Sequence, residues 1–416
     1  MRGYSDSPRR HCFKGPPICS RTVIRDVEST LGQTQAEPMT NGNQQKADVL
    51  IVGGGVVGAS IAYGLAAEGA RVGVLDAEDS DFSASRGNFG MISISNKGFN
   101  NLAYFRLSYA SSRLWPEFAS TLREQTGIDP AFDLKGKIYL PVGDAEFAAH
   151  VEKVAEYARR VGADYRHDIL NRADLQQLLG NVRLGERVAG GSFSPLDGLA
   201  EPLRLYSGLL NAIRRHGGWV LRDHRVGSIE HQGGMFTAHG QWGSLSAPRL
   251  VIAAGLGTPD LASQVGISVK VRPQRGQMMV TERVEQSFPY PISGLLRQNP
   301  EGTIMIGVST EEVGYDDRTT VSVLKSLAMK AVERLPALRS VHINRCWAAL
   351  RPRTEDGYPV YQESREYPGA FVITCHSGIT LAALHRRLLP KWILGGRKDA
   401  LLEPFGLGRL QNASAV

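Results

Sequence analysis

The chain is poor in cysteine: it has four in 416 residues and no C-x-x-C pair. Four cysteines are too few for a disulfide framework, and their spacing fits neither a zinc site nor an iron–sulfur cluster. Any iron–sulfur cluster that works with this protein is therefore expected on another chain. Cys346 and Cys375 have apolar neighbours in the sequence, so we interpret both as buried thiols rather than as ligands.

Long apolar runs are absent too. No run reaches the length of a membrane-spanning helix, and no apolar segment near the N-terminus has the form of a secretory signal. The net charge is +7, but the positive residues are scattered, which argues against nucleic-acid binding and favours a solvated surface around an anionic cofactor or substrate. We expect a cytoplasmic protein, with peripheral attachment at the inner face of the membrane as the alternative.

Residues 1–46 differ from the rest of the chain. They are rich in Ser, Pro, Gln, Gly and Arg and lack apolar periodicity, so we expect them to be disordered. Arg9 and Arg10 would suit an organelle-targeting peptide, whereas Asp26 would not. A second interpretation takes Met39 as the true start. The remaining length is enough for two or three domains, or for one domain with a large insertion.

The segment 47–76, ADVLIVGGGVVGASIAYGLAAEGARVGVLD, organises the rest of the chain. The short apolar run at 48–52 predicts a buried parallel strand. Small and apolar residues recur at helical spacing over 57–68, and 71–75 has the pattern of a second strand. The order of strand, helix and strand predicts a βαβ unit.

Three glycines in G-x-G-x-x-G spacing separate the first strand from the helix. Gly53 permits a tight turn, Gly55 has no side chain to keep a pyrophosphate from the backbone, and Gly58 lets helix and strand approach closely. The helix N-terminus offers free N–H groups, and Asp76 can accept hydrogen bonds from ribose hydroxyls. A glycine-rich turn in an ordinary βαβ unit is the alternative, but the complete pattern favours a dinucleotide site.

Three later turns carry weaker signals. The polar loop at 82–90 can bring hydroxyl, amide and N–H groups to a phosphate or a flavin edge. Residues 253–255, Ala-Ala-Gly, end an apolar strand and can pass under a nucleotide, although a plain strand-to-helix turn explains them equally well. The turn CHSG at 375–378 opens a helix whose N-terminus can stabilise negative charge, with a simple capping turn as the alternative.

The remaining pattern predicts further helices and strands. Helices are expected at 100–125 with an interruption near Pro116, 144–160, 172–179, 201–216, 321–334 and about 378–394. Strands are expected at 136–142, 190–193 (an edge strand), 219–221 (a third parallel strand), 226–231 with 235–239 (a hairpin), 250–254, 271–281 with 303–309 (an antiparallel pair) and 370–374. The inward side chains of two helices should be Phe147, Val151, Val154 and Ala158 in one, and Leu203, Tyr206, Leu210 and Ile213 in the other.

Taken together, these motifs resemble those of the D-amino-acid oxidase-like family of FAD-dependent amine and amino-acid oxidoreductases. The resemblance covers about 47–396. The glycine segment is similar to the family's FAD fingerprint, ASRGNFG to its A-S-x-x-N-x-G loop, AAG to its second nucleotide contact, and LRPRTEDGYPV and CHSGITLA to its C-terminal flavin segments. The ending CHSGITLAALHRRLLPKWILGG is most similar to the D-amino-acid dehydrogenase, hydroxyproline dehydrogenase, opine oxidase β subunit and hydrogen cyanide synthase flavoprotein types.

The resemblance implies a set of FAD contacts. They are Gly53, Gly55, Val57, Gly58, Asp76, Ser85, Arg86, Asn88, Gly90, Val226, Ala254, Gly255, Gly357, Ser377, Gly378, Ile379 and Thr380. In one departure from the family pattern, Asp76 replaces the more usual Glu, which shortens the reach to the ribose. In another, no Cys occupies the place where sarcosine oxidases attach flavin covalently, so FAD is expected to be bound noncovalently.

The resemblance also implies a substrate site. Arg351 matches the family arginine that clamps the substrate carboxylate, a role that suits the bidentate fork of a guanidinium. A structural ion pair is the alternative for this residue, and Arg297 and Arg353 are the next candidates. His376 is a candidate for the wall of the substrate pocket, with a histidine satisfied by the fold as the alternative.

The implied fold is α/β: a Rossmann-like FAD-binding domain of the glutathione-reductase type with an inserted α+β substrate domain on an antiparallel sheet. The expected parts are a disordered extension (1–46), an FAD-binding domain (47–134, 196–269 and 346–396), a substrate domain (135–195 and 270–345) and a C-terminal tail (397–416).

The implied activity is oxidation of the Cα–N bond of a small amino or imino acid, of the D-amino acid, glycine, proline, hydroxyproline or opine type, by hydride transfer to flavin N5. The alternative is a flavoprotein subunit of a multi-subunit amino-acid or opine dehydrogenase or hydrogen cyanide synthase, which passes electrons to a partner chain, a quinone or an iron–sulfur protein. A nicotinamide-dependent reductase and a non-enzymatic FAD-binding protein also remain open.

Overall fold

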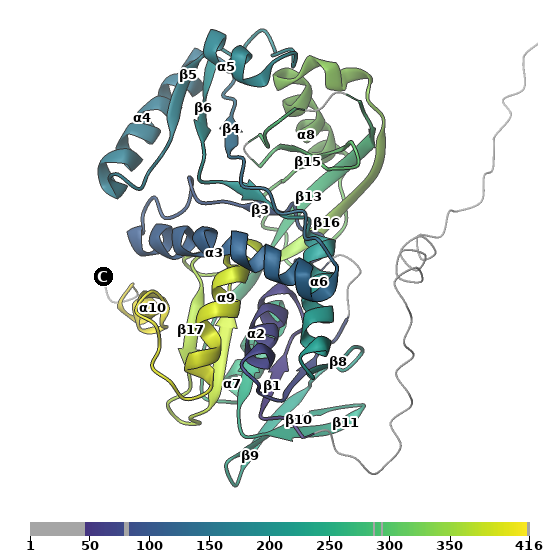
Figure 1. Cartoon of the computed structure of the whole chain (residues 1–416), viewed down its shortest axis with the longest axis vertical. Helices are drawn as coiled ribbons and strands as arrows, with labels where there is room; N and C mark the ends of the chain where they lie inside the picture. Colours follow the sequence, from purple (N-terminus) through teal and green to yellow (C-terminus); the bar gives the residue numbers. More distant parts are fainter. Residues whose placement is uncertain (1–45, 79–82, 286–287, 293, 414–416) are drawn as a thin grey trace, which may run out of the picture. The chain divides into compact units, whose positions relative to one another are not determined.

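The computed structural model describes residues 46–78, 83–285, 288–292 and 294–413 (Figure 1). The expectations for residues 1–45, disorder and targeting included, lie outside these ranges. One six-stranded sheet has the order β17-β18-β12-β1-β2-β8, and all its strands are parallel except the edge strand β17. Its strands are β1 (Val49–Val52), β2 (Val72–Leu75), β8 (Trp219–Leu221), β12 (Leu250–Ile252), β17 (Val360–Glu363) and β18 (Ala370–Thr374).

Both faces of this sheet are buried, which explains why its strands are continuous apolar runs. Val49 and Ile51 belong to the core on one face, and Leu50 and Val52 to the core on the other. The first face is covered by helices that pack on one another: α2 (Val56–Ala67), α3 (Leu102–Thr126), α6 (Pro202–Arg215) and α9 (Gly378–Ile393). The second face carries α7 (Thr258–Ser263) and the sheet of β9 (Ser228–Gln232), β10 (Met235–Gly240) and β11 (Gly243–Ala247).

A long antiparallel pair, β13 (Val271–Arg283) and β16 (Ile343–Thr354), forms the main part of another sheet. Figure 1 shows these two strands side by side, near α8 (Val321–Arg334) and β15 (Thr303–Gly307). The predicted antiparallel pairing of β13 with β15 is confirmed, and β14 (Leu296–Gln298) adds to β15. The domain boundary proposed at residue 346 falls within β16, so this strand connects the two proposed domains.

The remaining described elements complete the chain. They are β3 (Met91–Ile92), β4 (Lys137–Tyr139), α4 (Asp144–Val161), β5 (Asp168–Asn171), α5 (Arg172–Leu179), β6 (Gly190–Ser194), β7 (Gly198–Leu199) and α10 (Gly408–Ala413), with short 3₁₀ helices at Gly255–Gly257, Pro336–Ser340 and Glu403–Phe405. In the ranges that the structure describes, no helix combines the length and the apolar character needed to cross a membrane.

Two predictions about these elements are wrong. Pro116 does not interrupt α3, because the neighbouring side chains of Trp115 and Phe118 are buried and hold the helix across the missing N–H group. The strand at 190–193 is not an edge strand but the middle strand of the order β4-β6-β5. A Cβ atom at Gly191 would lie 2.4 Å from the Tyr139 carbonyl oxygen, so glycine here permits close strand packing.

The predicted inward faces of two helices also need correction. In α4 the buried side chains are Val154 and Tyr157, and Ala158 is exposed. In α6 Leu203 is 52% exposed, whereas Leu205 lies in the core. Both errors have one cause: the apolar stripe that faces the core is selected by the neighbouring elements, and the sequence offers more than one stripe at helical spacing.

Candidate functional site

The glycine turn between β1 and α2 is packed against backbone on two sides. Gly53 has φ of +104°, and a Cβ atom there would lie 2.3 Å from the carbonyl oxygen of Ala253. A Cβ atom at Gly58 would lie 1.9 Å from the carbonyl oxygen of Gly53. Ala254 lies on the same side of the turn, because its Cα would be 2.8 Å from the added Cβ of Gly53. The first glycine motif and the Ala-Ala-Gly turn after β12 are therefore neighbours.

The N-terminus of α2 offers hydrogen-bond donors to an anion. Its first turn has no acidic side chain, and the cap residue Gly55 has no side-chain hydrogen bond. The Val56 N–H donates to Ser85 Oγ at 2.9 Å. Among the described residues, nothing outside the helix accepts a hydrogen bond from the N–H groups of Val57 and Gly58. These free donors and the helix dipole suit a pyrophosphate.

Asp76 ends β2 beside the glycine turn. Its carboxylate accepts hydrogen bonds from the Gly54 N–H at 2.5 Å and from the Glu78 N–H at 2.9 Å. These bonds fix the carboxylate while each oxygen keeps a further lone pair. The position suits the predicted ribose contact, and it also shows that Asp76 orders the turn itself.

The side-chain amide of Asn88 holds the loop after residue 82 in shape. The Asn88 side chain donates to the Ala84 carbonyl at 3.2 Å and accepts from the Gly90 N–H at 2.8 Å. Arg86 pairs with Glu78 at 3.5 Å. The indole N–H of Trp347, on β16, donates to the Gly87 carbonyl at 3.3 Å, which brings the loop and β16 together.

The start of α9 lies against the start of α2. A Cβ atom at Gly378 would be 3.2 Å from Val57 Cγ2, and the two helices pack along their length. Thr380 Oγ1 accepts from the Ser93 N–H at 3.2 Å. The first turn of α9 has no acidic residue, and no side chain caps its N-terminus at Ser377. The segments 47–90 and 351–381, far apart in the sequence, thus meet at the N-termini of α2 and α9.

The other predicted FAD contacts lie on both sides of the six-stranded sheet. Ile379 is buried in the core on the helical side of the sheet, and Val226 in the core on the opposite side. Gly255 has φ of +58° in the turn after β12. Gly357 has φ of +75° in the turn after β16, and its backbone forms a hydrogen bond with the His376 side chain. Val226 is thus separated from α9 by the sheet.

The three candidate arginines have different surroundings. Arg353 lies against the turn after β16, where a Cβ atom at Gly357 would be 2.7 Å from its Nη2 atom. Arg351 donates to the Ser309 carbonyl at 3.0 Å, and burial and the nearby Arg353 lower its pKa to about 10. Arg297 is buried beneath Gly90, donates to the Ala200 carbonyl at 3.2 Å and pairs with Glu201 at 3.6 Å. Arg351 therefore remains the better candidate for a substrate carboxylate, and the contacts of Arg297 fit a structural role.

His376 lies among positive charges. Burial lowers its pKa well below the usual value, and Lys97, Arg353 and Arg351 lower it further. The imidazole is therefore neutral at pH 7. Sequence reasoning missed Lys97, whose Nζ donates to Ser377 Oγ at 2.5 Å and to the Tyr104 hydroxyl at 3.1 Å. No local pattern marks a lysine that meets its partner 280 residues further along the chain.

A buried ion pair holds the segment that carries Lys97, and sequence reasoning missed it too. Lys137 Nζ lies 3.2 Å from Asp197 Oδ1, and these side chains are 6% and 0% exposed. The same carboxylate accepts from the Ile94 N–H at 2.6 Å and from the Ser95 N–H at 3.2 Å. The pair thereby positions the backbone between Ser93 and Lys97 against α9.

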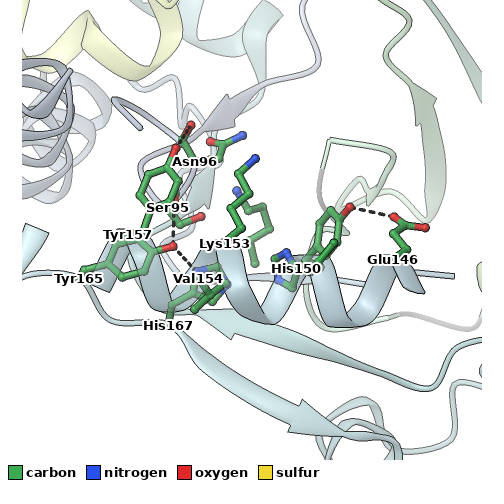
Figure 2. Close-up of a pocket in the computed structure, with 12 residues that line it drawn as sticks. Ser95, Asn96, Glu146, His150, Lys153, Val154, Tyr157, Tyr165 and His167 are labelled. Atoms are coloured by element: carbon green, nitrogen blue, oxygen red, sulfur yellow. Dashed lines mark hydrogen bonds between the residues drawn. The ribbon is translucent and has the colours of Figure 1, made fainter. Parts of the chain in front are cut away.

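A cavity of about 290 Å³ opens beside Ser95 and Asn96 and is lined mainly by α4 and β4 (Figure 2). None of the predicted FAD contacts lines it. Tyr165 donates to the Ser95 carbonyl at 3.2 Å and bonds His167 Nδ1 at 2.8 Å. Ser192 Oγ connects His167 to His150, at 2.7 and 2.6 Å from their Nε2 atoms. This chain of hydrogen bonds ends on a backbone carbonyl, so it fixes ring orientations.

The two histidines of this cavity predict a loss of stability in acid. Burial is the main cause that lowers the pKa of His150 and of His167 to about 4. In the unfolded chain their pKa is near 6.5, so the unfolded chain binds more protons than the folded protein between pH 6.5 and 4. The free energy of unfolding therefore decreases as the pH is lowered through this window. Urea unfolding should show a slope from each histidine of at most about 1.4 kcal/mol per pH unit.

The double variant His150→Gln/His167→Gln should be less stable at pH 7 but should have a flatter pH dependence between pH 6.5 and 4. The exposed His231 offers a control: His231→Gln should keep the wild-type slope. An unchanged slope in the double variant would contradict this account of the two buried rings.

The fold defines a class: an α/β protein with a dinucleotide-type glycine turn on a mainly parallel sheet and a further antiparallel sheet. The family model for FAD dependent oxidoreductases of the DAO type matches residues 48–389, and the chain belongs to this family. It is an FAD-dependent oxidoreductase. FAD fits the residues present, since the glycine cradle would be filled by added Cβ atoms and both helix N-termini lack acidic residues in their first turns.

Similar proteins share almost the whole chain. An opine oxidase subunit from Agrobacterium tumefaciens (strain Ach5) is 36% identical over 371 residues, which cover 89% of this chain and 99% of that protein. Hydrogen cyanide synthase subunit HcnC from Pseudomonas aeruginosa is 28% identical, covering 89% and 97%. The crystal structure of glycine oxidase from Geobacillus kaustophilus superposes with a TM-score of 0.79 at 25% identity, covering 87% and 98%.

Proposed function

We propose that this FAD-dependent oxidoreductase oxidises the Cα–N bond of an amino or imino acid whose carboxylate docks on Arg351. The proposal rests on the meeting of the glycine turn, the start of α9 and β16 in one place. Similarity to the opine oxidase subunit and to glycine oxidase supports an amino-acid substrate. The FAD contacts and the domain division implied by the resemblance are part of the proposal, as is noncovalent binding of FAD.

The groups of this site would contribute to the reaction mainly through electrostatic interactions. Bound FAD supplies the acceptor for the hydride from the substrate Cα. The N–H groups at the start of α9, together with Lys97, provide a positive potential that would stabilise negative charge on a flavin held there. Arg351 orients the substrate through its carboxylate. The same cations disfavour a nearby ammonium group, so they favour the neutral amine that hydride loss requires.

A panel of substrates tests this function. The purified protein should be yellow, with the visible absorption bands of oxidised flavin. Under anaerobic conditions these bands should bleach with at least one member of a panel of D- and L-amino acids, glycine, sarcosine, proline and hydroxyproline. A colourless protein that binds NAD would support the nicotinamide-dependent alternative instead. A yellow protein that is bleached neither by this panel nor by an opine would indicate a non-enzymatic flavoprotein.

The second candidate function is a subunit of a multi-chain dehydrogenase. Two similar proteins are described as subunits. In the part of the chain that the structure describes, no group of His, Cys, Asp and Glu is arranged to hold a metal ion, so we propose that an iron–sulfur acceptor would lie on the partner. Size-exclusion chromatography of the native complex with iron analysis tests this. A monomeric, iron-free protein that reduces oxygen or a quinone by itself would contradict it.

A further inference from the structure

The cavity shown in Figure 2 has flat aromatic walls. The ring of Tyr139 stacks on His150 with centroids 4.1 Å apart, and Tyr157 stacks on Tyr165 at 5.4 Å. In Figure 2, Lys153 lies between the two tyrosines Tyr157 and Tyr165 on one side and His150 on the other. A cavity of about 150 Å³ suffices to bind benzene, so this one, of about 290 Å³, has room for one aromatic ring with a polar substituent.

Two lysines line this cavity, one buried and one exposed. The buried Lys137 lies 3.2 Å from Asp197 Oδ1 and donates to Ser93 Oγ at 3.4 Å, which leaves one of its three N–H groups for a ligand. Within the described ranges, the exposed Lys153 has no carboxylate at ion-pairing distance, and its Nζ lies 5.9 Å from the centroid of the Phe99 ring.

The acid of this cavity is already compensated. Glu146 accepts hydrogen bonds from the Tyr139 hydroxyl and the Val142 N–H, each at 2.9 Å, and lies 3.6 Å from Arg334 Nη2. Burial is the main cause that lowers the pKa of the two histidines of the cavity to about 4, and lysine charge adds to it, so both rings are neutral at pH 7. The positive charge of Lys153 therefore has no counterpart in the cavity.

The cavity is preformed and separate from the site proposed for FAD and substrate. Its histidine and tyrosine rings are held by the chain of hydrogen bonds through Ser192 Oγ, so a ligand would not have to order them. None of Arg351, Arg353 and His376 lines it. Lys97, next to the lining residue Asn96, directs its Nζ to Ser377 at the start of α9 instead.

We propose that this cavity is a second ligand site, which binds a small aromatic carboxylate with the carboxylate on Lys153 and the ring against the aromatic walls. One uncompensated cation and one further N–H group, from Lys137, suit a monoanion better than a dianion such as phosphate. Flat rings on either side of the cation suit a planar ligand. The inference goes beyond the proposed function and does not depend on it, because the cavity shares no residue with the proposed FAD and substrate site.

A matched pair of probes tests this site: 4-fluorobenzoate and its uncharged analogue 4-fluorobenzamide. Fluorine NMR titration measures the binding of each to the Arg351→Gln holoenzyme, in which a carboxylate would lose its partner in the proposed substrate site. The carboxylate should bind about 10-fold more tightly than the amide, which is the gain expected from one charge-assisted hydrogen bond.

Two variants of α4 locate the site. Lys153→Gln should lower the affinity for 4-fluorobenzoate to near that for the amide. Ala149→Phe should remove the binding of both probes, because Ala149 lines the cavity and its exposed side chain can be enlarged without disturbing the core. Each variant should keep the FAD content of its parent, which shows that it is folded.

Two matched controls should leave binding unchanged. Lys325→Gln makes the same change in charge at an exposed lysine of α8. Ala158→Phe makes the same enlargement at an exposed alanine nine residues along α4, which is the opposite face of the helix.

Equal affinity for the two probes, or no saturable binding of either, overturns the inference. Binding of 4-fluorobenzoate that survives in both Lys153→Gln and Ala149→Phe places the probe elsewhere and also overturns it. Displacement of the probe by inorganic phosphate at a lower concentration than by benzoate would assign the cavity to a dianion, which contradicts the proposed ligand class. A preference for the carboxylate that disappears only in the two cavity variants supports the inference.

Discussion

Arg351→Gln is expected to lower kcat/KM for the best substrate by about 10²- to 10³-fold, the loss typical of removing one partner of a buried, hydrogen-bonded charge pair. The guanidinium is half-buried, bonded to the Ser309 carbonyl and beside Arg353. Its removal leaves the substrate carboxylate without its bidentate partner. FAD content should stay near that of the wild type, because no predicted FAD contact in the glycine turn touches this side chain.

Two further variants sharpen this test. Arg351→Lys should recover only part of the activity, because an ammonium cannot reproduce the planar fork of a guanidinium. Arg297→Gln should mainly destabilise the fold, since Arg297 is buried and paired with Glu201. A larger loss of kcat/KM in Arg297→Gln than in Arg351→Gln, at equal FAD content, would transfer the carboxylate role to Arg297.

Gly58→Ala is expected to abolish FAD binding and to destabilise the protein by about 3 kcal/mol, the upper part of the usual range for overpacking. The added Cβ would lie 1.9 Å from the Gly53 carbonyl oxygen. This obstacle is backbone of the glycine turn, so α2 must move away from β1 and the N-terminal donors move with it. The ratio of flavin to protein absorbance and the urea midpoint report the two effects separately.

Gly55→Ala and Gly408→Ala provide graded controls for this clash. At Gly55 the added Cβ would meet Ser85 Oγ at 2.9 Å, a side chain that can rotate, so the protein should fold and bind FAD more weakly. At Gly408 nothing lies within 4 Å and φ is not positive, so Gly408→Ala should be neutral. Normal FAD content in Gly58→Ala would contradict the packing role of this glycine.

Local patterns were sufficient where a structure is built from neighbours in the sequence. The β1–α2–β2 unit, the hairpin of β9 and β10, and the bounds of α5 and α8 agree with their predictions, because apolar periodicity, turn glycines and capping act within a few residues. The same holds for the glycine turn, where the spacing of Gly53 and Gly58 already encodes a close approach of helix and strand. The meeting of this turn with α9 came from resemblance to a family, and periodicity alone does not contain it.

The sequence by itself determined a βαβ dinucleotide fold and the positions of its buried strands, and its resemblance to a family implied FAD as the cofactor. Only the tertiary structure decided which stripe of α6 faces inward, that β6 is a middle strand, and that Lys97 and the Lys137–Asp197 pair support the start of α9. The reason is physical. A buried charge is stable only beside partners that compensate its lost hydration, and those partners come from distant segments that meet when the chain packs.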